Sequence, residues 1–175
     1  LLTSDLAVGA RRDFFPEEQK ILQNVFEKWN HEQYKVVDIY SMVSHLNGKA
    51  SRLVEIRSTE KGFPFYGAIK GKDGTFSSEG LYVSKDLAAL WNVQINDDLK
   101  VGDVTMKVSG VVEEDSSMGL RGFSLAPRIY FPLSKLGEPG LIRPGATGSF
   151  TYHYRIQDVS AEVQKAIKSE IYKNI

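Results

Sequence analysis

Three histidines and one acidic run are the side chains of this sequence that could bind a metal ion or catalyse hydrolysis. His31, His45 and His153 are far apart, without the paired spacing of a zinc-binding helix. The chain has no cysteine, which excludes thiolate zinc sites. Residues 113–115 are consecutive acids, whereas a calcium loop takes its oxygens from spaced positions. We therefore expect no metal centre, and we expect the acidic run to be a solvated loop tip.

The sequence also lacks the local motifs of the common enzyme classes. It contains neither a nucleophile elbow nor a glycine-rich phosphate loop. A dispersed Ser–His–Asp triad is assembled only by the fold, and no pattern here points to one. Lys+Arg and Asp+Glu each number 22, so the net charge is zero, which argues against a general nucleic-acid binder. We expect a protein that is not an enzyme and holds no catalytic residue.

Two further groups of side chains allow a binding interpretation and a structural one. Four arginines suggest an anion site, but we favour ordinary pairing with neighbouring acids; the arginines are Arg11, Arg12, Arg52 and Arg57, and the acids are Asp13, Glu55 and Glu60. The run Tyr-His-Tyr at residues 152–154 predicts a strand with one buried and one exposed face of rings.

The loop expected at residues 113–124 is the candidate contact site of the chain. It is polar, yet it contains Met118, Leu120 and Phe123. Methionine-containing apolar loops suit adaptable contact surfaces. We therefore name these three side chains as candidate contacts for a cargo or partner. The alternative is that they pack onto the core beneath the loop.

Hydrophobic periodicity predicts the elements that must position these residues. A helix is expected from Pro16 to about Asn30, with His31 at its end, and Ser84 is expected to cap a short helix over residues 85–91. A last helix follows a cap at Asp158 or Ser160. Alternation and β-branched content predict strands near residues 6–8, 35–46, 52–56, 63–69, 81–83, 104–112, 128–131 and 149–157.

This order of elements predicts an α+β fold. The length of 175 residues fits one domain or one domain with an inserted part. We expect a mixed α/β subdomain formed by both chain ends, residues 1–59 and 125–175. Residues 60–124 are expected to form an inserted, small, β-rich, barrel-like subdomain.

Several phrases, in this order, resemble the extracytoplasmic domain of ABC transporter permeases of the MacB/FtsX/LolC type, and specifically the YbbP-like subgroup. The phrases are SDLAVGARR at residues 4–12, SRLVEIR at 51–57, FPFYG at 63–67, GLYVS at 80–84, LKVGD at 99–103 and APRIYFP at 126–132. One departure is Trp-Asn-Val at residues 91–93, where the family usually has Leu-Gly-Leu.

The resemblance implies a permease with four transmembrane helices and this domain between the first and second. The domain would be porter-like and membrane-proximal at its chain ends, on the periplasmic or extracellular side of the bacterial inner (cytoplasmic) membrane. ATP would be bound by a separate cytoplasmic ABC ATPase subunit, so no cofactor is expected in this domain. The expected partners are that subunit, a second permease subunit and a periplasmic or lipid-linked cargo, with no nucleic acid.

The function implied is to couple ATP hydrolysis to export or extraction of a hydrophobic, lipid or lipoprotein cargo by mechanotransmission. In that mechanism the ATPase cycle moves the extracytoplasmic domains without passing cargo through the bilayer. The alternative hypothesis is an extracytoplasmic ligand-binding or sensory domain of a membrane receptor.

Overall fold

The computed structural model describes residues 2–118, 126–137, 141 and 148–175. The described elements include three α-helices, nine strands and, after β8, a short 3-10 turn. In chain order they are β1 (Leu6–Ala10), α1 (Pro16–Phe26), β2 (His31–His45), β3 (Ala50–Thr59), β4 (Ile69–Gly71), β5 (Leu81–Ser84), α2 (Lys85–Trp91), β6 (Asp98–Val101), β7 (Val104–Asp115), β8 (Arg128–Tyr130), η2 (Leu133–Lys135), β9 (Gly148–Ile156) and α3 (Ala161–Asn174).

All described strands belong to one mixed sheet with the order β1-β9-β2-β3-β8-β5-β7-β4. The pairs β3–β8 and β5–β7 are parallel, and the other pairs are antiparallel. Strand β6 pairs with both β2 and β7, so β2, β3, β8, β5, β7 and β6 form a closed ring that we call the barrel. The predicted α+β class is confirmed.

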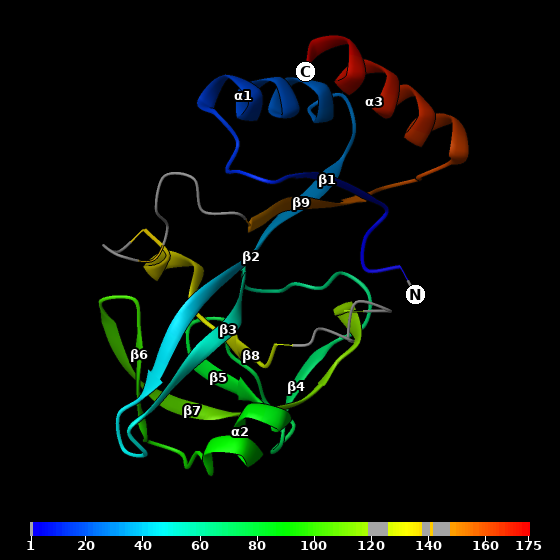
Figure 1. Cartoon of the computed structure of the whole chain (residues 1–175). Helices are drawn as coiled ribbons and strands as arrows, with labels where there is room; N and C mark the ends of the chain where they lie inside the picture. Colours follow the sequence, from blue (N-terminus) through cyan, green and yellow to red (C-terminus); the bar gives the residue numbers. More distant parts are fainter. Residues whose placement is uncertain (1, 119–125, 138–140, 142–147) are drawn as a thin grey trace.

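The long strand β2 connects the barrel to the rest of the molecule (Figure 1). Its first part pairs with β9, from His31 to Ile39, and its second part pairs with β3, from Val36 to His45. We call β1, β9, α1 and α3 the helical end. The barrel takes strands from both predicted subdomains, since β8 pairs with β3 on one side and with β5 on the other. The division at residues 60 and 124 stays a prediction.

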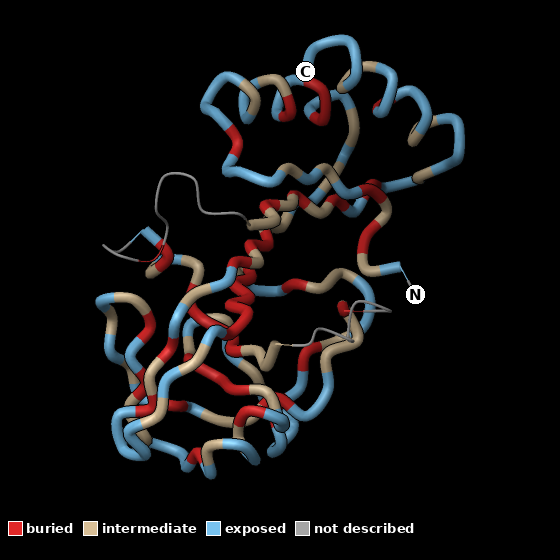
Figure 2. The backbone as a smooth tube through the Cα atoms, viewed as in Figure 1, coloured by how far each residue is buried: buried red, intermediate tan, exposed pale blue. Residues whose placement is uncertain are grey.

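The core runs without interruption from the barrel interior to the helices. Buried residues follow β2 and the barrel strands, whereas the outer faces of α1 and α3 are exposed (Figure 2). At the helical end, the Phe26 ring of α1 stacks on Tyr154 of β9 with a centroid distance of 3.6 Å. Ile167 of α3 is fully buried, as its four-residue periodicity predicted.

The helix caps follow the expected chemistry. Ser84 Oγ accepts the Leu87 N–H of α2, and Ser160, not Asp158, caps α3 by accepting the Val163 N–H. Such caps satisfy backbone donors that the first helical turn leaves unpaired.

Three predicted boundaries are wrong. Helix α1 ends at Phe26, because the Trp29 N–H donates to Phe26 O in a tight turn, and His31 therefore begins β2. Residues 63–68 are not a strand, since Pro64 has no N–H donor and Gly67 has a left-handed φ of 86°, and β4 begins only at Ile69. Strand β7 continues through Asp115, into the expected loop.

Among the described residues, no helix combines the length and apolar character needed to cross a membrane.

Candidate functional site

A cluster of buried charges lies where β2 stops pairing with β9 and continues beside β3. Arg57 Nη1 donates to both carboxylate oxygens of Asp38 at 2.9 Å, and Arg57 Nη2 donates to Ser117 Oγ at 3.0 Å. Arg57 Nε lies 3.7 Å from Asp115 Oδ2, and these two side chains are only 7% and 6% exposed. Tyr130 completes the set by donating its hydroxyl to Asp115 Oδ2 at 2.8 Å. We call these five residues the junction cluster.

The sheet register brings the junction cluster together. Asp38 and Arg57 are directly opposite each other on β2 and β3, and Tyr130 of β8 is the parallel neighbour of Arg57. Directly paired residues point to the same face of a sheet. A second ion pair lies beside the cluster on this face, with Arg128 Nη2 3.0 Å from Glu55 Oε2. Three adjacent strands therefore build one continuous polar layer.

Burial and neighbouring charges set the protonation of the junction cluster. Burial raises the pKa of Asp38, and Arg57 opposes that shift. Burial, and then the charge of Asp115, raises the pKa of Tyr130 above its usual value. Tyr130 is therefore a neutral donor at physiological pH. Buried charges need partners of opposite sign, and here two guanidinium groups, Arg57 and Arg128, meet three carboxylates. The arrangement holds strands together rather than presenting a reactive group.

The sequence-based pairing of the arginines is wrong at this site. Arg57 pairs with Asp38 and Asp115, not with Glu55 or Glu60, because its opposite residue on β2 is Asp38. Asp115 is buried instead of solvated, because β7 carries it under Tyr130. A usable signal was present, since Asp38 interrupts a β-branched run that otherwise reads as a buried strand.

A second contact joins the segment after β3 to the helical end, and we call Phe63, Phe65 and Tyr66 the aromatic bridge. The Phe65 ring stacks on Tyr34 with a centroid distance of 4.4 Å. The Tyr66 hydroxyl donates to Asp5 Oδ1 at 3.0 Å. Beside them, the Phe63 ring packs against the ring of His153 on β9, with a centroid distance of 4.9 Å. The barrel and the helical end are thus connected by β2 and by these rings.

Strand β9 alternates as predicted, between a buried face and a face that is only partly covered or exposed. Tyr152 and Tyr154 are both buried, as expected for one face. On the opposite face, His153 lies under Phe63, and its Nδ1 is 2.9 Å from Ser4 Oγ. That face is only partly covered, because the aromatic bridge packs over His153 while Arg155 is exposed. Burial, and then the charge of Arg57, lowers the pKa of His153 to about 4.

We predict that His153 titrates far below an ordinary histidine. Its folded pKa of about 4 lies below the usual 6.5, so between these values the unfolded chain binds the additional proton. Stability attributable to His153 is therefore complete above pH 6.5 and is lost as the pH falls toward 4. An NMR titration of the imidazole resonances measures this directly. A midpoint near 6.5 would contradict the packing of His153 under Phe63 as the cause of a lowered pKa.

The remaining candidate residues are placed as follows. Met118 is buried and follows Ser117 of the junction cluster, whereas Leu120 and Phe123 lie outside the described residues. In the part of the chain that the structure describes, no three His, Asp or Glu side chains are grouped so as to hold a metal ion. His45 is buried, and its Nε2–H donates to Asp97 Oδ2 at 2.8 Å.

Comparisons with known proteins agree on one class. No family model matches the chain. It is 24% identical to the uncharacterized ABC transporter permease YbbP of Escherichia coli (strain K12) over 109 residues, which are 61% of this chain and 14% of YbbP. The fold is similar to the extracellular domain of YknZ, a noncanonical ABC-type transporter from Gram-positive bacteria, with a TM-score of 0.60, 15% identity, and coverage of 91% of this chain and 81% of that one.

A permease-protein domain from Porphyromonas gingivalis also shares the fold, with a TM-score of 0.55, 13% identity, and coverage of 89% and 69%. The chain is thus homologous to the ABC transporter permease YbbP over the matched region and shares the fold of the YknZ extracellular domain and the Porphyromonas gingivalis permease-protein domain. The matched region spans about one seventh of YbbP's length, the 14% given above.

Proposed function

We propose that this domain transmits movement, driven by ATP hydrolysis in a cytoplasmic ABC ATPase subunit, to a hydrophobic, lipid or lipoprotein cargo outside the membrane. The observation that carries the proposal is strand β2, whose 15 residues run from the helical end into the barrel without a break. A strand of that length extends over roughly 50 Å at about 3.3 Å per residue. Such a strand, paired with β9 along its first part and with β3 along its second, suits the transmission of a displacement.

The junction cluster supports this role by stiffening β2 where its neighbours change. Only residues 36–39 of β2 pair with β3 and β9 together, so a load carried between the two ends by β2 crosses this short overlap. Arg57 binds Asp38 within the overlap and Asp115 and Ser117 outside it. A displacement of β9 would therefore reach β3, β7 and β8 as well.

The other parts of the proposal follow from the permease class. The domain would lie on the periplasmic side of a bacterial inner membrane, in a transporter with a second permease subunit. It would hold no cofactor, with ATP bound by the separate subunit. Met118, Leu120 and Phe123 remain the proposed contacts for cargo or partner. Met118 itself is 9% exposed, which for this side chain favours the alternative that it packs onto the core beneath.

The proposal is tested with the full-length permease and its ATPase in phospholipid vesicles, by following ATP-dependent removal of a fluorescent phospholipid. We expect removal with the wild-type protein. A double substitution in the aromatic bridge, Phe65→Ala with Tyr66→Phe, should lower removal several-fold while ATP hydrolysis continues, because the bridge then keeps only the contact of Phe63 with His153.

The matched control is Tyr172→Phe with Ile175→Ala on α3, since these two side chains are 85% and 55% exposed. The control should behave as wild type. Removal that is independent of ATP would overturn transport as the function. Unchanged removal by the bridge variant would overturn the role of the aromatic bridge in transmission.

A further inference from the structure

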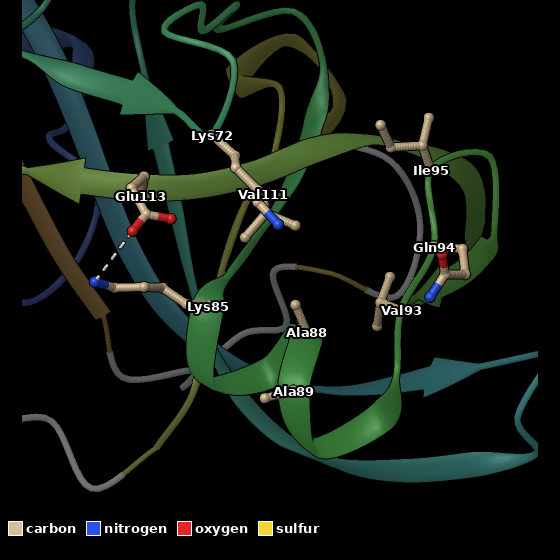
Figure 3. Close-up of a pocket in the computed structure, with 9 residues that line it drawn as sticks. All are labelled: Lys72, Lys85, Ala88, Ala89, Val93, Gln94, Ile95, Val111 and Glu113. Carbon is tan, nitrogen blue, oxygen red and sulfur yellow. Dashed lines mark ion pairs between the residues drawn. The ribbon is translucent and has the colours of Figure 1, made fainter.

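A groove of about 410 Å³ lies between α2, β7 and the segment that follows α2 (Figure 3). Small-molecule sites occupy roughly 300–1,000 Å³, so the groove falls in that range. Its floor is apolar and is made by Ala88, Ala89, Val93 and Val111. The two alanines leave space that larger side chains would fill. Ile95 stands at the groove with 65% of its surface exposed, which leaves apolar surface for a ligand to cover.

The wall of the groove is held in place before any ligand binds. Asn92 and Asn96 both have left-handed backbone conformations, with φ of 48° and 71°, which turn the chain away from α2 and back toward β6. Asp97 then accepts the Gln94 N–H at 2.9 Å and lies 2.8 Å from His45 Nε2. A site formed in advance costs less to order on binding.

The charges of the side chains that line the groove do not cancel. Lys85 Nζ and Glu113 Oε1 face each other at 3.7 Å (Figure 3). Lys72 also lines the groove, and it forms no ion pair with any residue that the structure describes. Its neighbour Asp73 instead accepts from the backbone and hydroxyl of Thr75. Two ammonium groups against one carboxylate leave one positive charge uncompensated beside an apolar floor.

We propose that this groove binds a small amphiphile with one alkyl chain and one anionic head group. The alkyl chain would cover the alanine and valine floor and Ile95, and the head group would pair with Lys72. A cationic head group would meet the excess positive charge instead, and a short anion without an alkyl chain would leave the floor exposed. The inference concerns binding by this chain alone and does not depend on the transport proposal.

Calorimetric titration of the 175-residue chain with dodecanoate, below its micelle concentration, tests this site. We expect saturable binding of one dodecanoate per chain, with acetate and dodecyltrimethylammonium binding much more weakly. Lys72→Glu should weaken dodecanoate binding at least about threefold, since it removes an ion pair with the head group and adds repulsion. The control with the same charge change is Lys100→Glu, on an exposed position of β6 outside the groove.

A second pair of variants tests the apolar part of the site. Ile95→Ser should weaken dodecanoate binding, whereas Leu90→Ser should not, because Leu90 is also exposed, at 57%, but does not line the groove. Both are surface positions, so both variants should keep the wild-type melting temperature within a few degrees. The site would be overturned by an absence of saturable binding, by equal affinity for dodecyltrimethylammonium, or by equal effects within either matched pair.

Discussion

Replacing Arg57 with glutamine should lower the free energy of unfolding by about 3–5 kcal/mol, because it leaves buried carboxylates without their counter-charge. Asp38 and Asp115 both lose a partner, and their side chains are 20% and 6% exposed. Glutamine keeps some hydrogen-bonding capacity but carries no charge. Urea denaturation at pH 7, followed by circular dichroism, measures the loss.

The pH dependence of the loss identifies its cause. Burial already raises the pKa of Asp38, and removal of the guanidinium raises it further. A protonated carboxyl needs no counter-charge, so the difference between wild type and Arg57→Gln should shrink as the pH falls toward that raised pKa. A difference that stays constant from pH 7 to pH 4 would assign the loss to packing instead of charge.

The control for this prediction is Arg12→Gln. Arg12 also forms a close ion pair, with Glu18 at 2.8 Å, but the Arg12 side chain is 50% exposed. Exposed pairs contribute about 0–1 kcal/mol. A loss at Arg12 as large as that at Arg57 would mean that burial does not govern these pairs.

Replacing Phe26 with alanine should lower the free energy of unfolding by about 3–5 kcal/mol, the range for deleting a fully buried aromatic ring. Phe26 is 0% exposed and stacks on Tyr154. It is the main apolar contact of α1 with β9, so its loss should loosen the helical end first. Hydrogen exchange in α1, measured by NMR, should rise more than exchange in the barrel.

Two comparison variants separate the effect of the Phe26–Tyr154 ring stack on stability from the effect of the Tyr154 hydroxyl. The Tyr154 hydroxyl is buried and has no hydrogen-bond partner among the described residues, so Tyr154→Phe should leave stability unchanged or raise it slightly. Phe15→Ala removes a ring that is 54% exposed and should cost well under 1 kcal/mol. A large loss in Tyr154→Phe would show that its hydroxyl makes a bond.

Local patterns in the sequence predicted most elements but not the charged layer. The cap at Ser84, the helix after it and the apolar face of α3 are local, and all three are confirmed. Arg57, Asp115 and Tyr130 meet only because β3, β7 and β8 are brought together by long-range pairing. Their partners are distant in the chain, so spacing alone assigned Arg57 to nearby acids.

The candidate contact residues and the groove also depend on long-range pairing that local sequence patterns do not predict. Met118 was named for its apolar character within a polar stretch, and only the course of β7 shows it to be buried. The groove brings together Lys72, Lys85 and Glu113 from separate elements. No local sequence motif predicts that these residues meet. Family resemblance supplied the class of protein, since no residue pattern in the chain specifies a chemical reaction.

The closed ring of strands also sets an order of events during synthesis. Every strand of the barrel lies before residue 131, so the ring can close when β8 is available. The first part of β2 must wait longer, because its partner β9 and the covering helix α3 come last in the chain. Folding as units from the amino terminus would thus complete the barrel first. Until β9 arrives, residues 31–35 are an unpaired strand edge, the kind of surface on which other chains can pair.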